Sequence, residues 1–425
     1  MLLRFGVANH LSICERQELS FAASSLKDRQ EGLLACEAVP KGAVVPAAVI
    51  YGANASGKTN LVDALAAMQK MILWSHTRGE PGKGVPREPF RLDPGCFKAP
   101  SQFDADFTIN NVRYHYGFEA TDEAFTAEWL YVFPRAHRRK LFERNEDEMD
   151  FGRWLRGANS NIAKLTRSNS LFLSAAAQNG HEQLSSVYDF FRSIEFIGKM
   201  SVSGMEASSR YVKKDLDDRV IKFLETMNTG VVGYRKKAVQ VPEEIQAIRR
   251  ELQPVLEKFS GGPVEIKLGD EDTLVAIELA HQGQGGEPVY FDLDLESAGT
   301  RRLLMILGQA YRALDEGLPL VVDELDASLH THACEAILKL FCTRKVNKYG
   351  AQLITTTHDT NLMKSDVLRR DQLWFVEKTS GGATEVYPLT DIRTRKGDNV
   401  ELGYLQGRYG ALPGGGPLSS IRELA

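Results

Sequence analysis

A glycine-rich turn between a buried strand and a helix constrains the fold of this chain more than any other feature. The run Ala43–Ile50 ends in small and β-branched apolar residues, which is typical of a strand buried on both faces. Apolar residues then recur at helical spacing over Leu61–Trp74. The segment that joins them is Gly52-Ala-Asn-Ala-Ser-Gly57-Lys58-Thr59. A strand, a turn and a helix in this order predict an α/β fold.

The turn fits the phosphate-loop pattern G-x-x-x-x-G-K-[ST] without a mismatch. Its glycines let the backbone turn tightly, so that successive N–H groups point at phosphate oxygens, and the following helix adds its positive N-terminal end. We predict that Lys58 reaches the β- and γ-phosphates of ATP and that the Thr59 hydroxyl binds Mg²⁺. The predicted nucleotide-binding residues of the loop are Asn54, Ala55, Ser56, Gly57, Lys58, Thr59 and Asn60.

A second apolar strand pattern, Pro319–Val322, ends in two neighbouring carboxylates. We predict that Asp323 holds the Mg²⁺ shell, either directly or through water, and that Glu324 polarises the attacking water as general base. An Asp-Glu pair can also cap the helix that follows it. The phosphate loop in the same chain favours the catalytic interpretation.

Three further segments carry polar residues near predicted ends of strands or helices. Ser297 and Gly299 lie where a predicted amphipathic helix begins. Taken alone, Ser297 is explained equally well as the N-cap of that helix. Asp326 follows the acidic pair, and His358 ends the strand pattern that starts at Leu353. Each of these residues alone is a weak signal. Their occurrence in one order after a phosphate loop is a strong one.

Together these segments resemble the ABC-type ATPases of the SMC/RecF-like group. Within this group the chain is most similar to small prokaryotic AAA-type ATP-binding proteins of antiphage defence and abortive-infection loci. The segments that carry the closer similarity are Tyr51–Leu61, Asn169–Ser174, Asp323–His330 and Tyr404–Pro413. The resemblance covers most of the predicted head and is loose in the middle of the chain.

The resemblance implies a role for each matching residue. Ser297 and Gly299 correspond to the signature motif that caps the γ-phosphate held by an opposite subunit, although Glu296 and Ala298 depart from its common wording. Asp326 corresponds to the loop that contacts the partner head. His358 corresponds to the switch histidine, so we count it with Glu324 as catalytic.

The resemblance also implies how the protein works. Two heads of a homo-oligomer would close around ATP and Mg²⁺, and hydrolysis would open them again. The chain would then be a sensor or clamp in antiphage defence that controls a separate effector, possibly a nuclease, since no nuclease module is evident after His358. Two alternatives stay open. One is a DNA-repair or chromosome-maintenance ATPase that binds DNA directly. The other is an assembly scaffold stabilised by ATP, against which Glu324 argues.

Charge and cysteine content limit partners and location. The net charge is −4, from 52 basic and 56 acidic residues, so contact with nucleic acid would need a local patch. Arg135–Lys140 is such a run, although basic runs are often only solvated surface. The five scattered cysteines are expected to be reduced thiols. No apolar run approaches the roughly 20 residues that span a bilayer, so we expect a cytoplasmic protein without membrane contact.

Strand patterns at both ends of the chain flank a middle block that looks mostly helical. We therefore expect an ABC-ATPase head with a mixed sheet and flanking helices, assembled from residues 1–145 and 261–425. Residues 146–260 are expected to form an inserted, mainly helical lobe, with a helix over Glu243–Phe259. A further strand is expected over Val264–Leu268. The segment Tyr404–Pro413 either docks on the head or contacts a partner.

Overall fold

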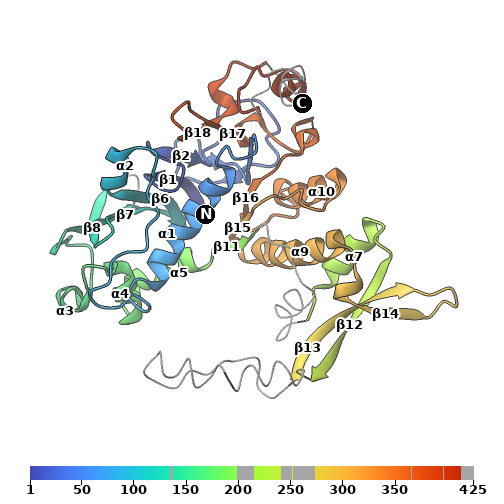
Figure 1. Cartoon of the computed structure of the whole chain (residues 1–425), viewed down its shortest axis with the longest axis horizontal. Helices are drawn as coiled ribbons and strands as arrows, with labels where there is room; N and C mark the ends of the chain where they lie inside the picture. The colour runs from blue at the N-terminus through green and yellow to red at the C-terminus, as the bar shows by residue number, and fades with distance from the viewer. Residues whose placement is uncertain are drawn as a thin grey trace. The chain divides into compact units, whose positions relative to one another are not determined.

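The computed structural model describes residues 1–134, 137–198, 215–240, 251, 273–364, 366–395 and 397–412 (Figure 1). The chain divides into two compact units. The first, which we call the head unit, comprises Met1–Lys199, Arg312–Asp326 and His330–Ala425. The other, which we call the second unit, comprises Met200–Tyr311 and Ala327–Leu329.

A six-stranded mixed sheet forms the centre of the head unit. Its order is β11 (Glu195–Ile197), β15 (Pro319–Val322), β16 (Gln352–Thr356), β5 (Ala47–Gly52), β17 (Leu373–Lys378) and β18 (Thr384–Pro388). Only the β17–β18 pair is antiparallel among these neighbours. Every residue of β5, β15 and β16 is buried, as expected for parallel strands covered on both faces. The helices α1 (Lys58–Trp74) and α10 (Thr331–Cys342) pack against β5.

This sheet confirms the predicted fold class. N-terminal strand β5 lies between the C-terminal strands β16 and β17, so the head is assembled from both ends of the chain. The remaining C-terminal elements are short: η3 (Thr360–Lys364), η4 (Arg370–Gln372), η5 (Leu389–Asp391) and α11 (Val400–Leu405). Within the described ranges, no helix is both long enough and apolar enough to cross a membrane.

A seven-stranded antiparallel sheet forms the other layer of the head unit. Its order is β10 (Glu148–Phe151), β9 (Arg139–Asn145), β8 (Phe125–Phe133), β7 (Val112–Ala120), β6 (Ser101–Ile109), β1 (Leu2–Ala8) and β2 (Gln17–Ser20). The β6–β7 hairpin turns at Asn110 and Asn111, both at positive φ, which confirms the predicted turn. The short strands β3 (Leu34–Ala35) and β4 (Ala43–Val44) pair with each other.

Residues 146–198 belong to the head unit, whereas we expected a lobe to begin at residue 146. They form β10, β11 and three helices: α3 (Asn159–Leu165), α4 (Phe172–Gln178) and α5 (Glu182–Arg192). α5 packs on α1 and β6, where Phe190 stacks on Phe107 with ring centroids 4.3 Å apart. The buried carboxylate of Glu128 accepts hydrogen bonds from the main-chain N–H groups of Phe172 and Leu173. An amphipathic helix has the same pattern whether it covers a sheet or forms a separate lobe, so the sequence could not place this boundary.

The described part of the second unit contains a three-stranded antiparallel sheet beside its helices. Its elements are α7 (Asp218–Thr226), β12 (Val231–Gln240), β13 (Thr273–Gln282), β14 (Pro288–Asp292), η2 (Leu293–Leu295) and the start of α9 (Ala298–Glu316). The expectation of a mainly helical lobe missed β12. Its outer basic residues Arg235 and Lys237 both pair with Glu278 of β13, which sequence alone does not show. The predicted helix Glu243–Phe259 (apart from residue 251) and the predicted strand Val264–Leu268 lie outside the described residues.

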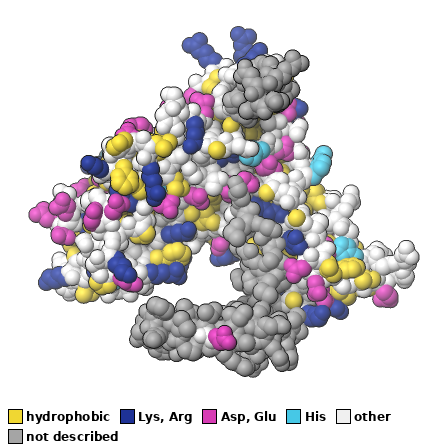
Figure 2. All heavy atoms as spheres, viewed as in Figure 1, with side chains coloured by type: hydrophobic (Ala, Val, Ile, Leu, Met, Phe, Trp, Pro, Cys, Tyr) yellow, Lys and Arg dark blue, Asp and Glu magenta, His cyan; other side chains and the backbone are white. Residues whose placement is uncertain are grey.

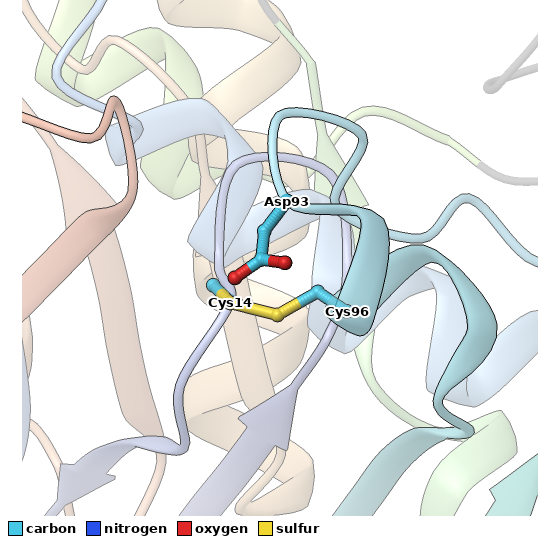
Figure 3. Close-up of side chains that lie close together, drawn as sticks. All are labelled: Cys14, Asp93 and Cys96. Carbon is cyan, nitrogen blue, oxygen red and sulfur yellow. A yellow bond between two sulfur atoms is a disulfide. The ribbon is translucent and has the colours of Figure 1, made fainter.

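A disulfide joins Cys14 to Cys96, so the expectation of five reduced cysteines is wrong for this pair (Figure 3). The two residues are 82 positions apart, and their Cα atoms lie 6.2 Å from each other. Cys14 follows β1, and Cys96 lies in α2 (Pro94–Lys98). Asp93 lies beside them, but bonded sulfur atoms are not thiolate metal ligands. Cys36, Cys334 and Cys342 are buried free thiols.

The disulfide gives the first testable prediction. In the unfolded oxidised protein, two of the five cysteines should stay unreactive toward a thiol reagent until reductant is added. Reductant should lower the free energy of unfolding by about 2–4 kcal/mol, because the bond restricts a long loop of the unfolded chain. The double variant Cys14→Ser/Cys96→Ser is the control, since reductant should leave its denaturant midpoint unchanged. Five reactive thiols in fresh, unreduced protein would contradict the pairing.

Candidate functional site

The phosphate loop is a compact turn between β5 and α1. Gly57 precedes α1 with φ 110°, a left-handed conformation that favours glycine. A Cβ atom at this position would lie 2.2 Å from the hydroxyl oxygen of Thr384, so the loop has no space for a side chain here. Ala55 also has a positive φ, and Ser56 is buried. The loop therefore has the tight geometry that the predicted phosphate-binding residues require.

The ammonium group of Lys58 lies folded against its own loop. Lys58 is buried, and its Nζ donates hydrogen bonds to the carbonyl oxygens of Gly52 at 2.8 Å and Ala53 at 2.9 Å. The first residues of α1 also carry main-chain N–H groups, and no preceding helical turn supplies carbonyl oxygens that could accept from them. A cation and main-chain N–H groups at one helix start form a site suited to an anion.

The two predicted Mg²⁺ ligands come together although they are far apart in sequence. The Thr59 hydroxyl lies 3.2 Å from Oδ2 of Asp323, and the Thr356 hydroxyl donates to Oδ1 of Asp323 at 2.6 Å. β5, β16 and β15 are parallel neighbours, so their carboxyl ends carry these groups to one edge of the sheet. One hydroxyl and one carboxylate oxygen fit the small number of protein ligands that Mg²⁺ uses beside phosphates. The donor set therefore fits the predicted ion.

Glu324 has a strained backbone that its neighbours hold in place. Its φ is 50°, a value in the left-handed region that is uncommon outside glycine. The N–H of Glu324 donates to the Thr356 hydroxyl at 2.7 Å, and the N–H of Leu325 donates to the Thr356 carbonyl at 2.9 Å. Strain of this kind is found at functional sites where the surroundings enforce one conformation. Sequence reasoning found Glu324 but missed Thr356, whose hydroxyl accepts from the main-chain N–H of Glu324 and donates to the Asp323 carboxylate.

Asp326 and His358 also lie together in the head unit. The main-chain N–H of His358 donates to the Asp326 carboxylate at 3.2 Å, and the His358 side chain is exposed. His358 follows β16, beside the strand that ends before Asp323. The structure thus brings the predicted residues of the phosphate loop, the acidic pair, Asp326 and His358 to one sheet edge.

Ser297 and Gly299 lie in the second unit, at the start of α9. The Ser297 hydroxyl accepts a hydrogen bond from the N–H of Thr300 at 3.0 Å, which is the geometry of a helix N-cap. A Cβ atom on Gly299 would lie 2.8 Å from the carbonyl oxygen of Ser328. α9 itself continues from the second unit into the head unit. The capping interpretation of Ser297 is therefore satisfied within the chain.

A polar link behind the phosphate loop was not found from sequence. The Ser12 hydroxyl accepts from the Asn60 side chain at 2.6 Å and is hydrogen-bonded to the Thr384 hydroxyl at 2.7 Å. Thr384 in turn donates to the carbonyl oxygen of Ser56 at 2.9 Å. Ser12 and Asn60 border a hollow of about 400 Å³ that Lys378 also lines. Three segments remote in sequence meet here, and those that contribute Ser12 and Thr384 carry no recognisable motif.

The C-terminal aromatic segment docks on the head unit. Tyr404 and Tyr409 are buried, and the Tyr404 ring lies 6.2 Å from that of Tyr51, the residue before the phosphate loop. The Tyr404 hydroxyl donates to the carbonyl oxygen of Ala411 at 3.0 Å. The docking alternative thus holds for both tyrosines, while Pro413 lies outside the described residues.

Comparison with known proteins places the chain in a family. No curated protein matches it. The similar solved structures include two SMC head structures, both at low identity. The SMC head bound to the C-winged helix domain of ScpA is 12% identical, with a TM-score of 0.39 over 91% of this chain and 96% of that one. The Smc head with an extended coiled coil bound to the C-terminal domain of ScpA, derived from Pyrococcus furiosus, is 13% identical, with a TM-score of 0.40 over 92% and 97%.

The family match is the finding that decides the assignment. A family model described as "AAA domain, putative AbiEii toxin, Type IV TA system" matches residues 47–364, which is more than half of the 425 residues. The matched range starts with β5 and includes the phosphate loop, the acidic pair and His358. This confirms the predicted relation to AAA-type proteins of abortive infection. The chain therefore belongs to the family of AAA domains described as putative AbiEii toxins of type IV TA systems.

Proposed function

We propose that this protein is an ABC-type ATPase that dimerises around ATP and controls a separate effector protein, a nuclease, in antiphage defence. The observation that carries the proposal is the convergence of Thr59, Asp323 and Glu324 at one sheet edge beside the phosphate loop. The family description names one component of a two-component toxin–antitoxin system, which supports the existence of a partner. Cytoplasmic location stays a prediction.

The residues of the loop would bind the triphosphate. The N–H groups at the start of α1 would donate to phosphate oxygens, and Lys58 would exchange its two carbonyl partners for the β- and γ-phosphates. Thr59 and Asp323 would hold Mg²⁺, which supplies positive charge against the phosphate oxygens. Thr356 keeps the Asp323 carboxylate in place through its hydrogen bond.

Glu324 would act on the attacking water. As a carboxylate next to Asp323, it can accept a proton from water and orient the oxygen toward the γ-phosphate. The hydrogen bond from its N–H to Thr356 fixes its backbone, so the direction of the side chain is limited. His358 would contact the γ-phosphate from the neighbouring strand end, and Asp326 holds the main chain of His358.

The nucleotide site is expected to need a second copy of the chain. Ser297 and Gly299 would reach the γ-phosphate bound by the partner and add N–H and O–H donors to it. Asp326, at the start of the loop after the acidic pair, would couple this contact to His358. A dimer with two identical composite sites follows from two-fold symmetry.

This function predicts ATP-dependent association. With Mg²⁺ and a non-hydrolysable ATP analogue, light scattering after size-exclusion chromatography should show a mass twice that of the nucleotide-free protein. The variant Lys58→Ala should stay monomeric under the same conditions, because it lacks the cation for the β- and γ-phosphates. When ATP replaces the analogue, dimer formation should be accompanied by Mg²⁺-dependent release of phosphate. A monomeric mass with saturating analogue bound would contradict the proposal.

A second candidate function, direct binding of DNA, is favoured by one cluster in the head unit. Basic and acidic side chains are interspersed over the face in Figure 2, so DNA contact would need a local patch. Arg139 and Arg153 lie over the Trp154 ring, with their guanidinium carbons 3.9 and 4.8 Å from its centroid. Arg138 lies over the Tyr131 ring, with its guanidinium carbon 4.7 Å from the ring centroid.

The three arginines of this cluster have no acidic partner in the described ranges. The neighbouring Lys140, in contrast, pairs with Asp150 and Glu143. Arg135 lies outside those ranges.

This cluster gives a prediction for the DNA alternative. The double variant Arg139→Glu/Arg153→Glu should weaken binding of a fluorescent duplex at least tenfold, because phosphate binding depends on locally placed cations. The slope of log affinity against log salt should become shallower by about 0.9 for each phosphate contact that is lost. Lys348→Glu, an exposed charge reversal in the head unit, is the control. Equal affinity for all three proteins would remove the support for this alternative.

A further inference from the structure

The disulfide between Cys14 and Cys96 lies at an exposed part of the head unit. Cys96 is half-buried in α2, and that helix has no buried residue. The three free cysteines, in contrast, are all buried. Figure 3 shows the bond between α2 and the loop that follows β1. A short helix without buried side chains can open locally, which gives a small thiol access to the bonded sulfur atoms.

Cys14 closes a tight turn that comprises residues 9–14, which we call the 9–14 turn. The N–H of Asn9 donates to the carbonyl oxygen of Cys14 at 3.0 Å. The main chains of His10 and Ile13 exchange two hydrogen bonds of 2.8 Å, and the Ile13 side chain is buried. These contacts make the turn one unit, so a constraint on Cys14 acts on all of its residues.

The same turn packs directly behind the phosphate loop. The Thr384 N–H donates to the carbonyl oxygen of Ser12 at 2.7 Å. The Ser12 hydroxyl accepts from the Asn60 side chain and is hydrogen-bonded to the Thr384 hydroxyl. A Cβ atom on Gly57 would lie 3.0 Å from the Ser12 hydroxyl oxygen, so the turn and the loop are in close contact. A change in the position of the 9–14 turn therefore reaches the residues predicted to bind phosphate.

On its other side, the 9–14 turn is joined to α2 by the disulfide and by hydrogen bonds. The buried Asn9 side chain donates to the carbonyl oxygens of Cys96 and Ala99, the latter at 2.7 Å. Arg87 also donates to the Ala99 carbonyl at 2.7 Å. Once the disulfide is broken, these hydrogen bonds hold α2 without a covalent link, and each opening of α2 leaves the buried Asn9 amide without two acceptors. Reduction therefore loosens the turn, while the pairing of β1 with β6 stays in place.

We propose that the Cys14–Cys96 bond is a reversible modification site for dithiols, and that its reduction weakens the binding of ATP at the phosphate loop. A thiolate of the dithiol attacks the sulfur of Cys96, the S–S bond breaks, and Cys14 leaves as a thiolate that takes up a proton. The second thiol of the dithiol then displaces Cys96. The two cysteines gain two electrons and two protons in total, and the dithiol becomes a disulfide.

The direction of the effect follows from the order of the 9–14 turn. In the oxidised protein the turn is already held against the phosphate loop. In the reduced protein the nucleotide has to order the turn when it binds, and this loss of conformational entropy lowers its affinity. The inference rests on the ATP binding proposed above. It adds to that function a control by the redox state of the chain.

The affinity of the full chain for a fluorescent ATP analogue with Mg²⁺ tests the inference. Treatment with dithiothreitol should weaken binding about tenfold, a usual size for coupling between two sites. The variant Cys14→Ser/Cys96→Ser should bind like the reduced protein, with or without dithiothreitol. Equal affinity of the oxidised and reduced proteins would overturn the inference and leave the proposed ATP binding intact. Absence of binding by both forms at millimolar analogue would overturn the proposed ATP binding as well.

A redox titration of the unmodified protein decides the question if the double variant does not fold. Coupling is reciprocal, so a saturating ATP analogue should protect the disulfide by the same factor. A tenfold factor corresponds to a reduction potential that is lower by about 30 mV for this two-electron couple. A potential that the analogue leaves unchanged would contradict the inference.

The variant Ser12→Ala tests the route from the disulfide to the phosphate loop. It keeps the disulfide but removes the hydroxyl contacts with Asn60 and Thr384. The difference in ATP affinity between the oxidised and reduced forms should therefore shrink, as expected for two changes that act through one contact. Ser25→Ala, an exposed serine outside the turn, is the control and should keep the full difference. A difference of full size in Ser12→Ala would refute this route.

Discussion

Replacement of Glu324 by Gln is expected to reduce ATP turnover by about 10²–10⁴-fold, the usual contribution of a general base. Gln has the same shape as Glu but cannot accept the proton of the attacking water. The hydrogen bonds that fix the backbone of Glu324 come from main-chain N–H groups to Thr356 and do not involve the replaced carboxylate. Binding of ATP should therefore persist, and the closed dimer should accumulate.

Three assays test this expectation. They measure phosphate release in a single turnover, the affinity for a fluorescent ATP analogue, and the mass of the protein in solution. Glu335→Gln is the matched control, because Glu335 lies on α10 in a surface pair with Lys339. It should match the unmodified protein in all three assays. Turnover that survives in Glu324→Gln would show that another group is the base. Loss of both turnover and ATP affinity would assign Glu324 a structural role instead.

The local parts of the candidate nucleotide site could be predicted from sequence because their geometry is local. A glycine turn between a buried strand and a helix fixes the direction of its own N–H groups, so Gly57, Lys58 and Thr59 were identified without tertiary information. Asp323 follows a fully buried strand, and strands of this kind lie parallel in the centre of a sheet. The contact between Thr59 and Asp323 then follows from carboxyl ends that share one edge.

The parts that sequence did not show depend on contacts between remote segments. Thr356 looks like an ordinary strand residue. Its hydroxyl group, however, donates to the Asp323 carboxylate and accepts from the main-chain N–H of Glu324. Cys14 and Cys96 meet only because the strand pairing of β1 and β6 brings their flanking loops together. β12 was missed because its basic residues are neutralised by Glu278 on a strand more than 30 positions later. Periodicity describes which face of an element is apolar, but not what covers that face.

The second large effect is expected from mixing two inactive variants. Lys58→Ala should lack ATP binding, and Ser297→Asp should place a negative charge opposite the γ-phosphate of the partner subunit. Asp is as good a helix N-cap as Ser, so the hydrogen bond with the N–H of Thr300 and the start of α9 should be kept. Each variant alone should hydrolyse ATP at about 1% of the normal rate or less, in line with loss of a group that stabilises the transition state.

An equal mixture of the two variants, combined without nucleotide before ATP is added, should recover between about a quarter and about a half of the normal rate. Random pairing makes half of the dimers mixed and exclusive mixed pairing makes all of them mixed, and each mixed dimer has one complete site of two. In that site, the phosphate loop comes from the Ser297→Asp chain and the intact Ser297 from the Lys58→Ala chain. If Ser297 served only as the N-cap that its hydrogen bond shows, Ser297→Asp alone would be active. If it acted within its own subunit, the mixture would be no more active than the two variants measured apart. Recovery is therefore the result that requires two copies of the chain at one nucleotide.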